Sequence, residues 1–548
     1  MRGLMQRQPL LVLSILTFAA RHHGAGEVVS NAVEGGRHRY NYREAERRAR
    51  RLARALERLG VRRHDRVGTL AWNSYRHLEL YYAVSGMGAV CHTVNPRLFD
   101  EQVAYIVDHA EDRVLCVDPG FVPLVERIAP RLAHPPAAVV VTTDRAHMPE
   151  VALPAGVGLH CYEELLAEAD EDFAWPVVDE DDACALCYTS GTTGHPKGVL
   201  YSHRSTVLHA YGVNLADAFG LRAVDRVLPV VPMFHVNAWG IPHAAPMVGA
   251  SLILPGSRLD GPTLQELMTS ERVTMAAGVP TVWQGLLDHL ERSGIRLDGV
   301  QRILIGGAAC PPHLIEGFDR YGVRVEHGWG MTEISPVGAY NSPKPSSAGL
   351  EPEAALRRRA KQGRAFHGVD LKIVDDEGRE LPWDGITSGH LTVRGHWVCA
   401  GYFGGEGEST HDPEGWFRTG DIGTIDPDGY LEITDRAKDL IKSGGEWISS
   451  LALEAVALAH PDVAEAAVIA ARHPVWNERP LLLVVPKPGR EPDPAAILAE
   501  FVGKVSKWSV PDAAEIVPTL PRTATGKLQK VVLRQQYGDY YLRAVAAD

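Results

Sequence analysis

The sequence predicts an α/β protein with a large N-terminal domain of layered α/β subdomains and a small α+β domain at the C-terminus. Up to about residue 430, short runs of β-forming residues alternate with segments of helical periodicity. Residues 439–548 instead show helix, strand, strand and helix signals. Because alternating strands and helices favour parallel sheets, we expect ligands at the carboxyl ends of the strands.

The composition limits the classes of partner. The chain has 548 residues, 45% hydrophobic and 23% charged, with a formal net charge of -12. That length allows a large core and several domains. The acidic balance argues against binding to nucleic acid or to an anionic membrane, since there is no basic excess to neutralise phosphates or headgroups. Small molecules are the expected partners.

The elements of the N-terminal part are read from periodicity. Residues 42–60 place Ala and Leu at helical spacing beneath Arg and Glu, which predicts a helix. The runs expected to be strands are 65–72, 113–118, 137–143, 226–231, 300–307 and 323–330. A loop is expected at 342–349, "SPKPSSAG".

The C-terminal part begins with a hairpin signal. An Asp-Gly turn lies inside "GTIDPDGYLEIT" (423–434), which predicts two antiparallel strands. The expected elements that follow are a helix at 450–460, strands at 463–471 and 479–487, and a helix at 495–505.

Two local features allow more than one interpretation. Cys184 and Cys187 form a C-x-x-C pair without a second pair at zinc spacing, so two small core side chains on a buried strand are favoured over a metal or redox site. "RQPLLVLSILTFAARHHG" (7–24) could be a signal peptide or a packed amphipathic helix that uses Leu10, Leu13, Ile15 and Phe18. The helix is favoured, because Arg21 and two histidines replace the usual small residues of a cleavage site. No other segment approaches the roughly 20 apolar residues of a membrane span.

The stretch "CYTSGTTGHPKG" (187–198) has a composition suited to holding phosphate oxygens. It fails the P-loop pattern G-x-x-x-x-G-K-[ST], because Pro196 or Val199 stands where the second glycine should be. Its hydroxyls and backbone N–H groups could still cradle a polyphosphate, with Lys197 as a mobile counter-charge. The alternative is a plain flexible surface loop.

Five motifs in order support the phosphate interpretation: "YTSGTTGHPKG" (188–198), "GWGMTE" (328–333), "TGD" (419–421), "DRAKDLIKSGGEWIS" (435–449) and "PRTATGK" (521–527). Together they resemble the signatures of the adenylate-forming superfamily, which includes acyl-CoA synthetases, firefly luciferases and peptide-synthetase adenylation domains. The resemblance covers nearly the whole chain. Within it, "PVVPMFHVNAWG" and "GEWISS" look most like bacterial medium- and long-chain fatty acyl-CoA synthetases.

The resemblance implies an ATP-dependent, AMP-forming fatty acid–CoA ligase that uses Mg²⁺ and takes coenzyme A as co-substrate. An acyl-adenylate and pyrophosphate form first, and then acyl-CoA and AMP. It also implies a nucleotide- and acyl-binding domain at 1–435, a hinge at 436–438, and a mobile lid at 439–548 that rotates between the two steps. A cytoplasmic location is expected, and a homodimer is compatible with the sequence.

The resemblance carries over specific site residues. The expected catalytic residues are Lys527, Glu333, Thr332, His235 and Lys442, with Glu333 and Thr189 as metal ligands. The phosphate loop supplies Thr189, Ser190, Gly191, Thr192, Thr193, Gly194 and Lys197. The expected adenine slot is Gly307, Ala308, Ala309, Trp329 and Gly330, and the ribose is expected at Asp421 and Arg436. The expected hinge and pantetheine-tunnel residues are Lys438, Gly444, Gly445 and Trp447. The acyl pocket is expected at Val236, Trp239, Gly240 and Gly278, where the glycines would leave space for an aliphatic chain.

Taken singly, several of these residues have ordinary interpretations. Lys527 could be a solvated surface charge, Asp421 could cap a turn, and Trp239 could be core packing. One departure from the long-chain enzymes is Phe366 in "QGRAFHGV", where they carry a proline. Two other functions stay open: a ligase for another carboxylic acid, such as a short thioether-containing or branched acid, and a non-catalytic adenylate-binding sensor.

Overall fold

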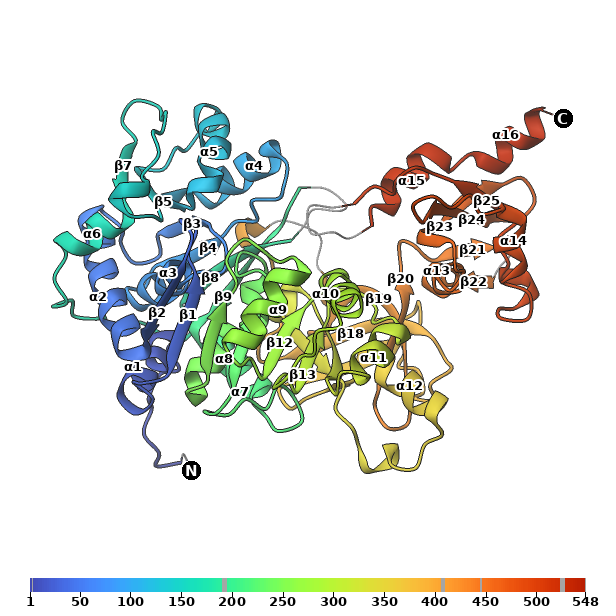
Figure 1. Cartoon of the computed structure of the whole chain (residues 1–548), viewed down its shortest axis with the longest axis horizontal. Coiled ribbons are helices and arrows are strands. Elements are labelled where there is room, and N and C mark those ends of the chain that lie inside the picture. Colours follow the sequence, from blue (N-terminus) through green and yellow to red (C-terminus); the bar gives the residue numbers. More distant parts are fainter. Residues whose placement is uncertain (2, 190–194, 406–409, 444–445, 523–527, 548) are drawn as a thin grey trace. The chain divides into compact units, whose positions relative to one another are not determined.

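The structure is a computed structural model, and it describes residues 1, 3–189, 195–405, 410–443, 446–522 and 528–547 (Figure 1). The chain divides into two compact units. The first comprises Met1–Thr189, His195–Asp370 and Arg394–Phe417, and the second comprises Leu371–Val393 and Arg418–Asp548. The boundaries at 435 and 439 expected from the sequence stay a prediction.

A seven-stranded sheet forms one half of the first unit. In spatial order its strands are β7 (Gly158–Cys161), β6 (Ala138–Val141), β5 (Asp112–Val117), β3 (Arg66–Leu70), β4 (Val90–Thr93), β8 (Ala183–Tyr188) and β9 (Gly198–Ser202). Neighbouring strands are parallel except for β8 and β9, which pair antiparallel. The phosphate loop therefore joins two antiparallel strands at one edge of this sheet.

A nine-stranded sheet forms the other half. Its strands, in order, are β16 (Arg364–Ala365), β15 (Val337–Tyr340), β14 (Arg324–Gly330), β13 (Arg302–Ile305), β12 (Met275–Gly278), β10 (Arg226–Pro229), β11 (Ser251–Leu254), β1 (Glu27–Asn31) and β2 (Arg37–Asn41). From β14 to β1 the strands are parallel, and the outer pairs at both ends are antiparallel.

The α-helices of the first unit are α1 (Val12–His22), α2 (Tyr42–Arg58), α3 (Tyr75–Gly86), α4 (Asp100–Ala110), α5 (Val122–Ile128), α6 (Tyr162–Glu168), α7 (His203–Val213), α8 (Ile241–Val248), α9 (Gly261–Ser270), α10 (Pro280–Ser293), α11 (Pro312–Asp319) and α12 (Pro352–Ala360). The apolar run near the N-terminus forms α1. Leu13 and Ile15 are buried there, whereas Phe18, expected to pack, is exposed. Helix α2 begins where the Asn41 side chain accepts a hydrogen bond from Glu44 N, a local N-cap.

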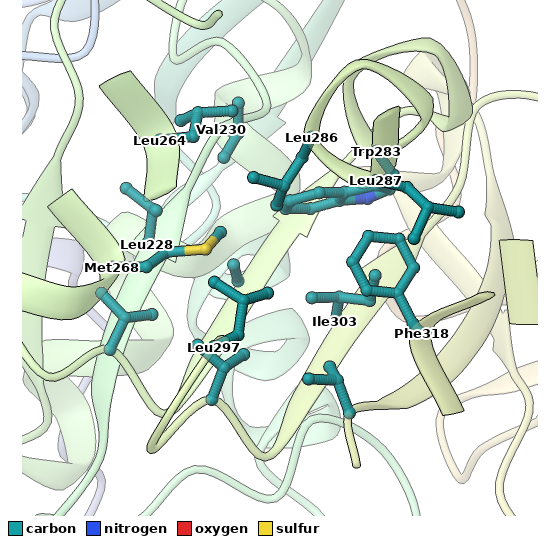
Figure 2. Packing of buried hydrophobic residues seen from close by; sticks show 14 of the residues in the cluster. Leu228, Val230, Leu264, Met268, Trp283, Leu286, Leu287, Leu297, Ile303 and Phe318 are labelled. Atoms are coloured by element: carbon teal, nitrogen blue, oxygen red, sulfur yellow. The ribbon is translucent and has the colours of Figure 1, made fainter. Parts of the chain in front are cut away.

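A hydrophobic core of this half lies between the nine-stranded sheet and helices α9, α10 and α11 (Figure 2). Leu228 of β10 and Ile303 of β13 meet Met268, Trp283 and Phe318 of the three helices. The Trp283 indole N–H donates to Leu304 O at 3.2 Å, so its one polar atom is satisfied inside the core. Burying each large side chain contributes about 1.5–3 kcal/mol.

Two sheets lie wholly or mostly in the second unit. The first consists of β17 (Val369–Val374), β18 (Gly389–Gly395), β19 (Phe417–Ile425) and β20 (Leu431–Arg436). The other consists of β22 (Glu446–Ile448), β21 (Ile441–Ser443), β24 (Asn477–Pro486) and β23 (Val463–His473), with β25 (Ala513–Ile516) parallel to β24. Its helices are α13 (Ser450–Leu458), α14 (Pro494–Ala499), α15 (Lys530–Tyr537) and α16 (Tyr540–Ala547).

The C-terminal sheet has apolar cores on both faces. In β24, Leu482 packs with α13 and α14 on one face, whereas Leu481 and Leu483 pack with Leu533 of α15 on the other. This alternation is the two-residue period of a strand buried on both sides. The fold class expected from the sequence is therefore confirmed, a layered α/β part and a small α+β part.

Most of the individual elements are confirmed as well. All the expected strands form, the Asp-Gly hairpin joins β19 and β20, and Cys184 and Cys187 lie buried on β8. The helix expected at 495–505 ends earlier, at Ala499. Within the described ranges, every helix is too short or too polar to cross a lipid bilayer.

Candidate active site

The base of the phosphate loop is held by a narrow antiparallel ladder. Tyr188 and Gly198 are register partners at the ends of β8 and β9. One step further, Thr189 N donates to Lys197 O at 2.9 Å, and Lys197 N donates to the Thr189 hydroxyl at 3.1 Å. The two ends of the loop are thus fixed beside each other. Ser190, Gly191, Thr192, Thr193 and Gly194 lie outside the described residues.

The motif "GWGMTE" (328–333) begins at the end of β14 and is bonded to β9, the strand that follows the expected phosphate loop. Beyond Gly330 the chain enters a 3₁₀ turn, η5 (Thr332–Ile334), in which Thr332 and Glu333 are both buried. The Tyr201 hydroxyl donates to Thr332 O at 2.6 Å, which ties the turn to β9. Because β9 leaves the phosphate loop, one strand positions both motifs.

Tyr402 connects the anion and the cation of the site. Its hydroxyl donates to Glu333 Oε1 at 2.8 Å, and the Lys197 ammonium lies 4.9 Å from the centre of its ring. Lys197 and Glu333 therefore contact opposite parts of one side chain. The Lys197 ammonium and the Glu333 carboxylate therefore lie close to the residues where the expected phosphate loop begins and ends.

The surroundings of Glu333 keep neighbouring acids protonated. Burial and the Glu333 charge together raise the pKa of Tyr402 well above its usual value, so the phenol stays a hydrogen-bond donor. Burial, with a smaller contribution from Glu333, raises the pKa of the Cys399 thiol to about 12. Cys399 N also donates to Glu333 O at 2.8 Å. Tyr402 and Cys399 consequently add no negative charge beside Glu333.

Small exposed residues follow β13. Gly307, Ala308 and Ala309 are exposed, and His327 Nε2 lies 3.2 Å from Ala308 O, which anchors this short segment from below. Burial lowers the pKa of His327, so its ring is neutral there. Three small, exposed residues in succession leave their backbone accessible, as expected of a slot for a planar base.

Trp329 and Gly330 form a tight crossing at the end of β14. A Cβ on Gly330 would overlap Pro336 O, at 2.0 Å, and one on Gly338 would lie 2.8 Å from the Trp329 ring. Trp329 is 8% exposed. Glycine at these two positions leaves the room in which the Trp329 indole packs against β15.

The wall expected to bind the acyl group has an unusual backbone. Val236, Asn237, Ala238 and Trp239 have φ values of 43°, 50°, 47° and 57°, and Gly240 follows at 76°. A left-handed residue with a side chain costs about 1–2 kcal/mol. Buried contacts hold the segment: Tyr81 OH and Cys187 Sγ both donate to Asn237 Oδ1, at 3.2 and 3.4 Å.

This left-handed turn aims Trp239 at the end of β13. A Cβ on Gly306 would lie 2.9 Å from the Trp239 ring, so the indole rests on the backbone at that point. His235, at the start of the turn, is half-buried. The backbone that positions Trp239 is therefore strained, and strained backbone is often found at functional sites.

The open space expected at two glycines is taken by the protein itself. A Cβ on Gly240 would lie 2.6 Å from the His209 ring, and one on Gly278 would lie 2.8 Å from the Trp283 ring. The space that a Cβ would occupy at these two positions is thus taken by the rings of His209 and Trp283. Contact of Gly240 and Gly278 with a substrate stays a prediction.

Phe366, the departure noted in the sequence, has a clear packing role. Its ring stacks on Trp397 with centroids 5.7 Å apart, and Trp397 donates to Val337 O at 3.1 Å. A Cβ on Gly212 would meet both rings. Phe366 therefore supports β15 and α7 through aromatic contact.

The second unit contains the expected ribose pair. Asp421 of β19 and Arg436 of β20 are register partners, and Arg436 Nε lies 2.7 Å from Asp421 Oδ1. Asp421 is 2% exposed, and its N–H donates to the Thr419 hydroxyl at 3.1 Å. Arg436 thus orients the Asp421 carboxylate, which can accept hydrogen bonds from a ligand's hydroxyl groups.

The hinge and tunnel motif lies further along the same unit. Lys438 is exposed, and Asp439 N and Leu440 N both donate to Arg436 O, which makes a tight turn around it. Lys442 of β21 and Trp447 of β22 are register partners, with the ammonium 5.3 Å from the indole. Gly444, Gly445 and Lys527 lie outside the described residues.

Comparison with known proteins agrees with this geometry. Residues 17–403 match the family described as AMP-binding enzyme, and residues 452–527 match the AMP-binding enzyme C-terminal domain. The chain belongs to the AMP-binding enzyme family. Its adenylate-forming character is thereby confirmed.

Individual relatives cover the whole chain. It is 52% identical to a 3-methylmercaptopropionyl-CoA ligase of Ruegeria lacuscaerulensis, over 98% of this chain and 99% of that one. It is 51% identical to a medium-chain-fatty-acid–CoA ligase of Ectopseudomonas oleovorans, over 99% of both. The crystal structure of ATP-bound MatB from Rhodopseudomonas palustris aligns with a TM-score of 0.81 at 27% identity, covering 97% of this chain and all of that one.

Sequence reasoning missed Tyr402, Tyr201 and Asn237. Each acts on a motif residue that is distant in sequence: Tyr402 on Glu333, Tyr201 on Thr332, and Asn237 on the left-handed turn. In the sequence, two of them could have been noticed only by their closeness to a motif: Tyr201 follows the expected phosphate loop, and Asn237 lies inside "MFHVNAWG".

Proposed function

We propose that this family member is an ATP-dependent acid–CoA ligase whose acid is a medium- or long-chain fatty acid. The observation that carries the proposal is the joint contact of Glu333 and Lys197 with Tyr402, beside the ends of the phosphate loop. A ligase of this kind must neutralise a nucleotide polyphosphate while a second anion, the carboxylate, approaches it.

In the first step, a carboxylate oxygen of the acid bonds to the α-phosphorus of ATP, and the bond to the bridging oxygen breaks to release pyrophosphate. Lys197 follows the β- and γ-phosphates, and Thr332 orients the α-phosphate. Asp421 accepts hydrogen bonds from the ribose hydroxyls while Arg436 holds its carboxylate. Lys527 would neutralise charge between the α-phosphate and the acid.

The residues present fit Mg²⁺ bound together with a nucleotide. Among the described residues there is no group of three or more His, Cys, Asp or Glu side chains that could hold a metal alone. Mg²⁺ in nucleotide sites usually takes one or two protein ligands and completes its shell with phosphates and water. Glu333, with the Thr189 hydroxyl, meets that requirement. The ion would draw charge from the phosphates as pyrophosphate leaves.

In the second step, the thiol sulfur of CoA bonds to the acyl carbon, the bond to AMP breaks, and the thiol proton goes to solvent. Rotation at Lys438 would withdraw Lys527 and bring the face that carries Lys442 and Trp447 to the acyl carbon. Gly444 and Gly445 would leave room for the pantetheine arm.

The acid is assigned from the wall around His235. That wall is mostly apolar, with Val236 and Ala238 buried and Trp239 on the β13 backbone. Residues 230–240 contain no Asp or Glu that could pair with an α-amino group. A second candidate is a short thioether-containing acid, because the 52% relative is named a 3-methylmercaptopropionyl-CoA ligase. Trp239 would decide between these two acids by limiting the depth of the acyl pocket.

The test is a thioesterification assay with Mg-ATP and CoA across straight-chain acids of graded length and 3-methylmercaptopropionate. We expect the highest kcat/KM for a medium or long chain, with acyl-CoA, AMP and pyrophosphate in equal amounts. A maximum at the thioether acid would favour the second candidate. Nucleotide binding without product from any acid would favour the sensor and contradict both ligase assignments. The homodimer and the cytoplasmic location stay predictions.

A further inference from the structure

A buried charged network lies at the expected hinge of the second unit, and none of its residues is among the site residues named above. It contains two buried carboxylates, Asp435 and Glu454, which are 1% and 8% exposed, and one buried ammonium group, that of Lys530, a residue that is 7% exposed. Lys530 Nζ is 2.6 Å from Glu454 Oε1 and 2.6 Å from the Ser450 hydroxyl. Buried charges are costly unless they are paired, so a network of this kind requires a reason.

Ser450 carries the network to Asp435. Ser450 N donates to Asp435 Oδ2 at 2.5 Å, and the Ser450 hydroxyl lies 2.8 Å from the same oxygen. Because Lys530 donates to the Ser450 oxygen, the hydroxyl proton is left to be donated to Asp435. Lys530 thus orients the one hydroxyl that reaches the carboxylate.

These contacts cross the hinge. Asp435 belongs to β20 and precedes Lys438, whereas Ser450, Glu454 and Lys530 follow it. Bonds among the residues that follow Lys438 move together when the chain rotates there. The bonds from Ser450 to Asp435, together with the Ser449 hydroxyl bond to Thr434 O, join the two sides.

Helix α15, which carries Lys530, has a second cation, Arg534, that contacts the residue directly after Lys438. Arg534 lies four residues after Lys530, on the same face of α15, and its Nη1 is 2.6 Å from Asp439 Oδ1. Helix α15 therefore contacts the chain just beyond the hinge directly, and the chain just before it through Ser450. The same helix begins three residues after Lys527.

We propose that Lys530 and Asp435 are positioning residues that form, through Ser450, a charged latch across the hinge and hold the C-terminal elements in one of the two orientations used in the reaction. The inference rests on the proposed two-step function. Rotation at Lys438 must separate Ser450 from Asp435, so the strength of this latch sets how readily the enzyme passes from one half-reaction to the other.

The test uses full-length Asp435→Asn and Lys530→Met variants. Each half-reaction is measured separately: pyrophosphate release without CoA, and acyl-CoA formation from synthetic acyl-adenylate. Both variants should change the ratio of the two rates in the same direction by about threefold or more, because each removes a charged partner of one latch. Lys530→Arg, which keeps the charge, should stay closer to the wild type. A merely structural role would lower both rates in proportion.

Lys504→Met is the matched control, since Lys504 pairs with Glu500 on the surface of the same unit, and its ratio should equal that of the wild type. Ser450→Ala, which removes only a hydroxyl, replaces either variant if that variant does not fold. A ratio unchanged in the latch variants, or shifted in opposite directions, would overturn the proposal.

A second readout does not depend on ligase activity. Trypsin cleavage after the exposed Lys438, followed by mass spectrometry under native conditions, should be faster in the latch variants than in Lys504→Met. If the wild type made no acyl-CoA from any acid, the proposed function would fall, and this cleavage rate alone would decide the latch. Equal cleavage rates would overturn it.

Discussion

The Tyr402 hydroxyl donates to Glu333 Oε1 at 2.8 Å while the Lys197 ammonium lies over the ring of the same tyrosine. One side chain thus lies between the carboxylate expected to bind the metal and the cation expected to bind phosphate. Neither contact is visible in the motifs, because Tyr402 is 69 residues from Glu333.

Removal of this hydroxyl should weaken the first half-reaction. Tyr402→Phe keeps the ring beneath Lys197 and deletes the donor to Glu333, so pyrophosphate release should slow by about tenfold, as expected for a lost hydrogen bond to a charged group. Tyr211→Phe, at an exposed tyrosine of the same unit, is the control.

A double variant shows whether Tyr402 acts through Glu333. Glu333→Gln should itself raise the Mg²⁺ concentration needed for half-maximal rate, since a hard anionic ligand is lost. Adding Tyr402→Phe to Glu333→Gln should then cost much less than about tenfold, because contacting residues are not additive. Full additivity would show that the tyrosine acts elsewhere.

Asp421→Ala should weaken nucleotide binding. The change removes an acceptor for ribose hydroxyls and leaves Arg436 without its carboxylate, so the Kd of a non-hydrolysable ATP analogue should rise by about tenfold or more. Calorimetric titration measures this, and Asp384→Ala, an exposed turn residue of the same unit, is the control. An unchanged Kd would remove Asp421 from the ribose site.

Acid sensitivity should depend on His209. Burial, with a smaller contribution from the neighbouring His243, lowers the pKa of His209 from 6.5 to about 3, and its Nε2 accepts from Val337 N at 3.2 Å. The unfolded chain therefore binds more protons between those values. The stability from the neutral ring is fully present above about pH 6.5 and declines as the pH falls towards 3, by about 1.4 kcal/mol per pH unit.

His209→Gln keeps an acceptor and removes the titration. The fall in thermal midpoint between neutral pH and about pH 5 should consequently be smaller in this variant than in the wild type, while His22→Gln, at an exposed histidine, should match the wild type. An identical fall in all three proteins would mean that His209 is not a neutral buried group.

The parts predicted from sequence are those encoded locally. Strands such as β13 and the Asp-Gly hairpin have their pattern within a few residues. The roles expected of Glu333 and Asp421 from the motif order stay predictions. The left-handed turn at Val236–Gly240 could not be predicted, because valine and tryptophan disfavour positive φ and only tertiary contacts such as Tyr81 to Asn237 impose it. The pairing of Lys530 with Glu454 depends in the same way on how α13 and α15 meet.

The two half-reactions should separate in variants of the lid. Lys527→Ala should slow adenylation by about 10² to 10³, the scale of losing one transition-state donor, and still convert synthetic acyl-adenylate to acyl-CoA. Gly445→Leu should do the opposite by filling the thiol path. Lys438→Pro should resemble Gly445→Leu, because a fixed φ hinders rotation. Proportional loss of both activities in all three would leave the rotating lid without support.

The central claim is that the acid's carboxylate attacks the α-phosphorus of ATP, and an oxygen label tests it most directly. The wild-type enzyme is given a fatty acid labelled with ¹⁸O in both carboxylate oxygens, together with Mg-ATP and CoA, and the products are weighed by mass spectrometry. Adenylation predicts that one labelled oxygen passes from the acid to AMP and the other stays in the thioester. Label in inorganic phosphate with ADP as the nucleotide product, or unlabelled AMP, would contradict it.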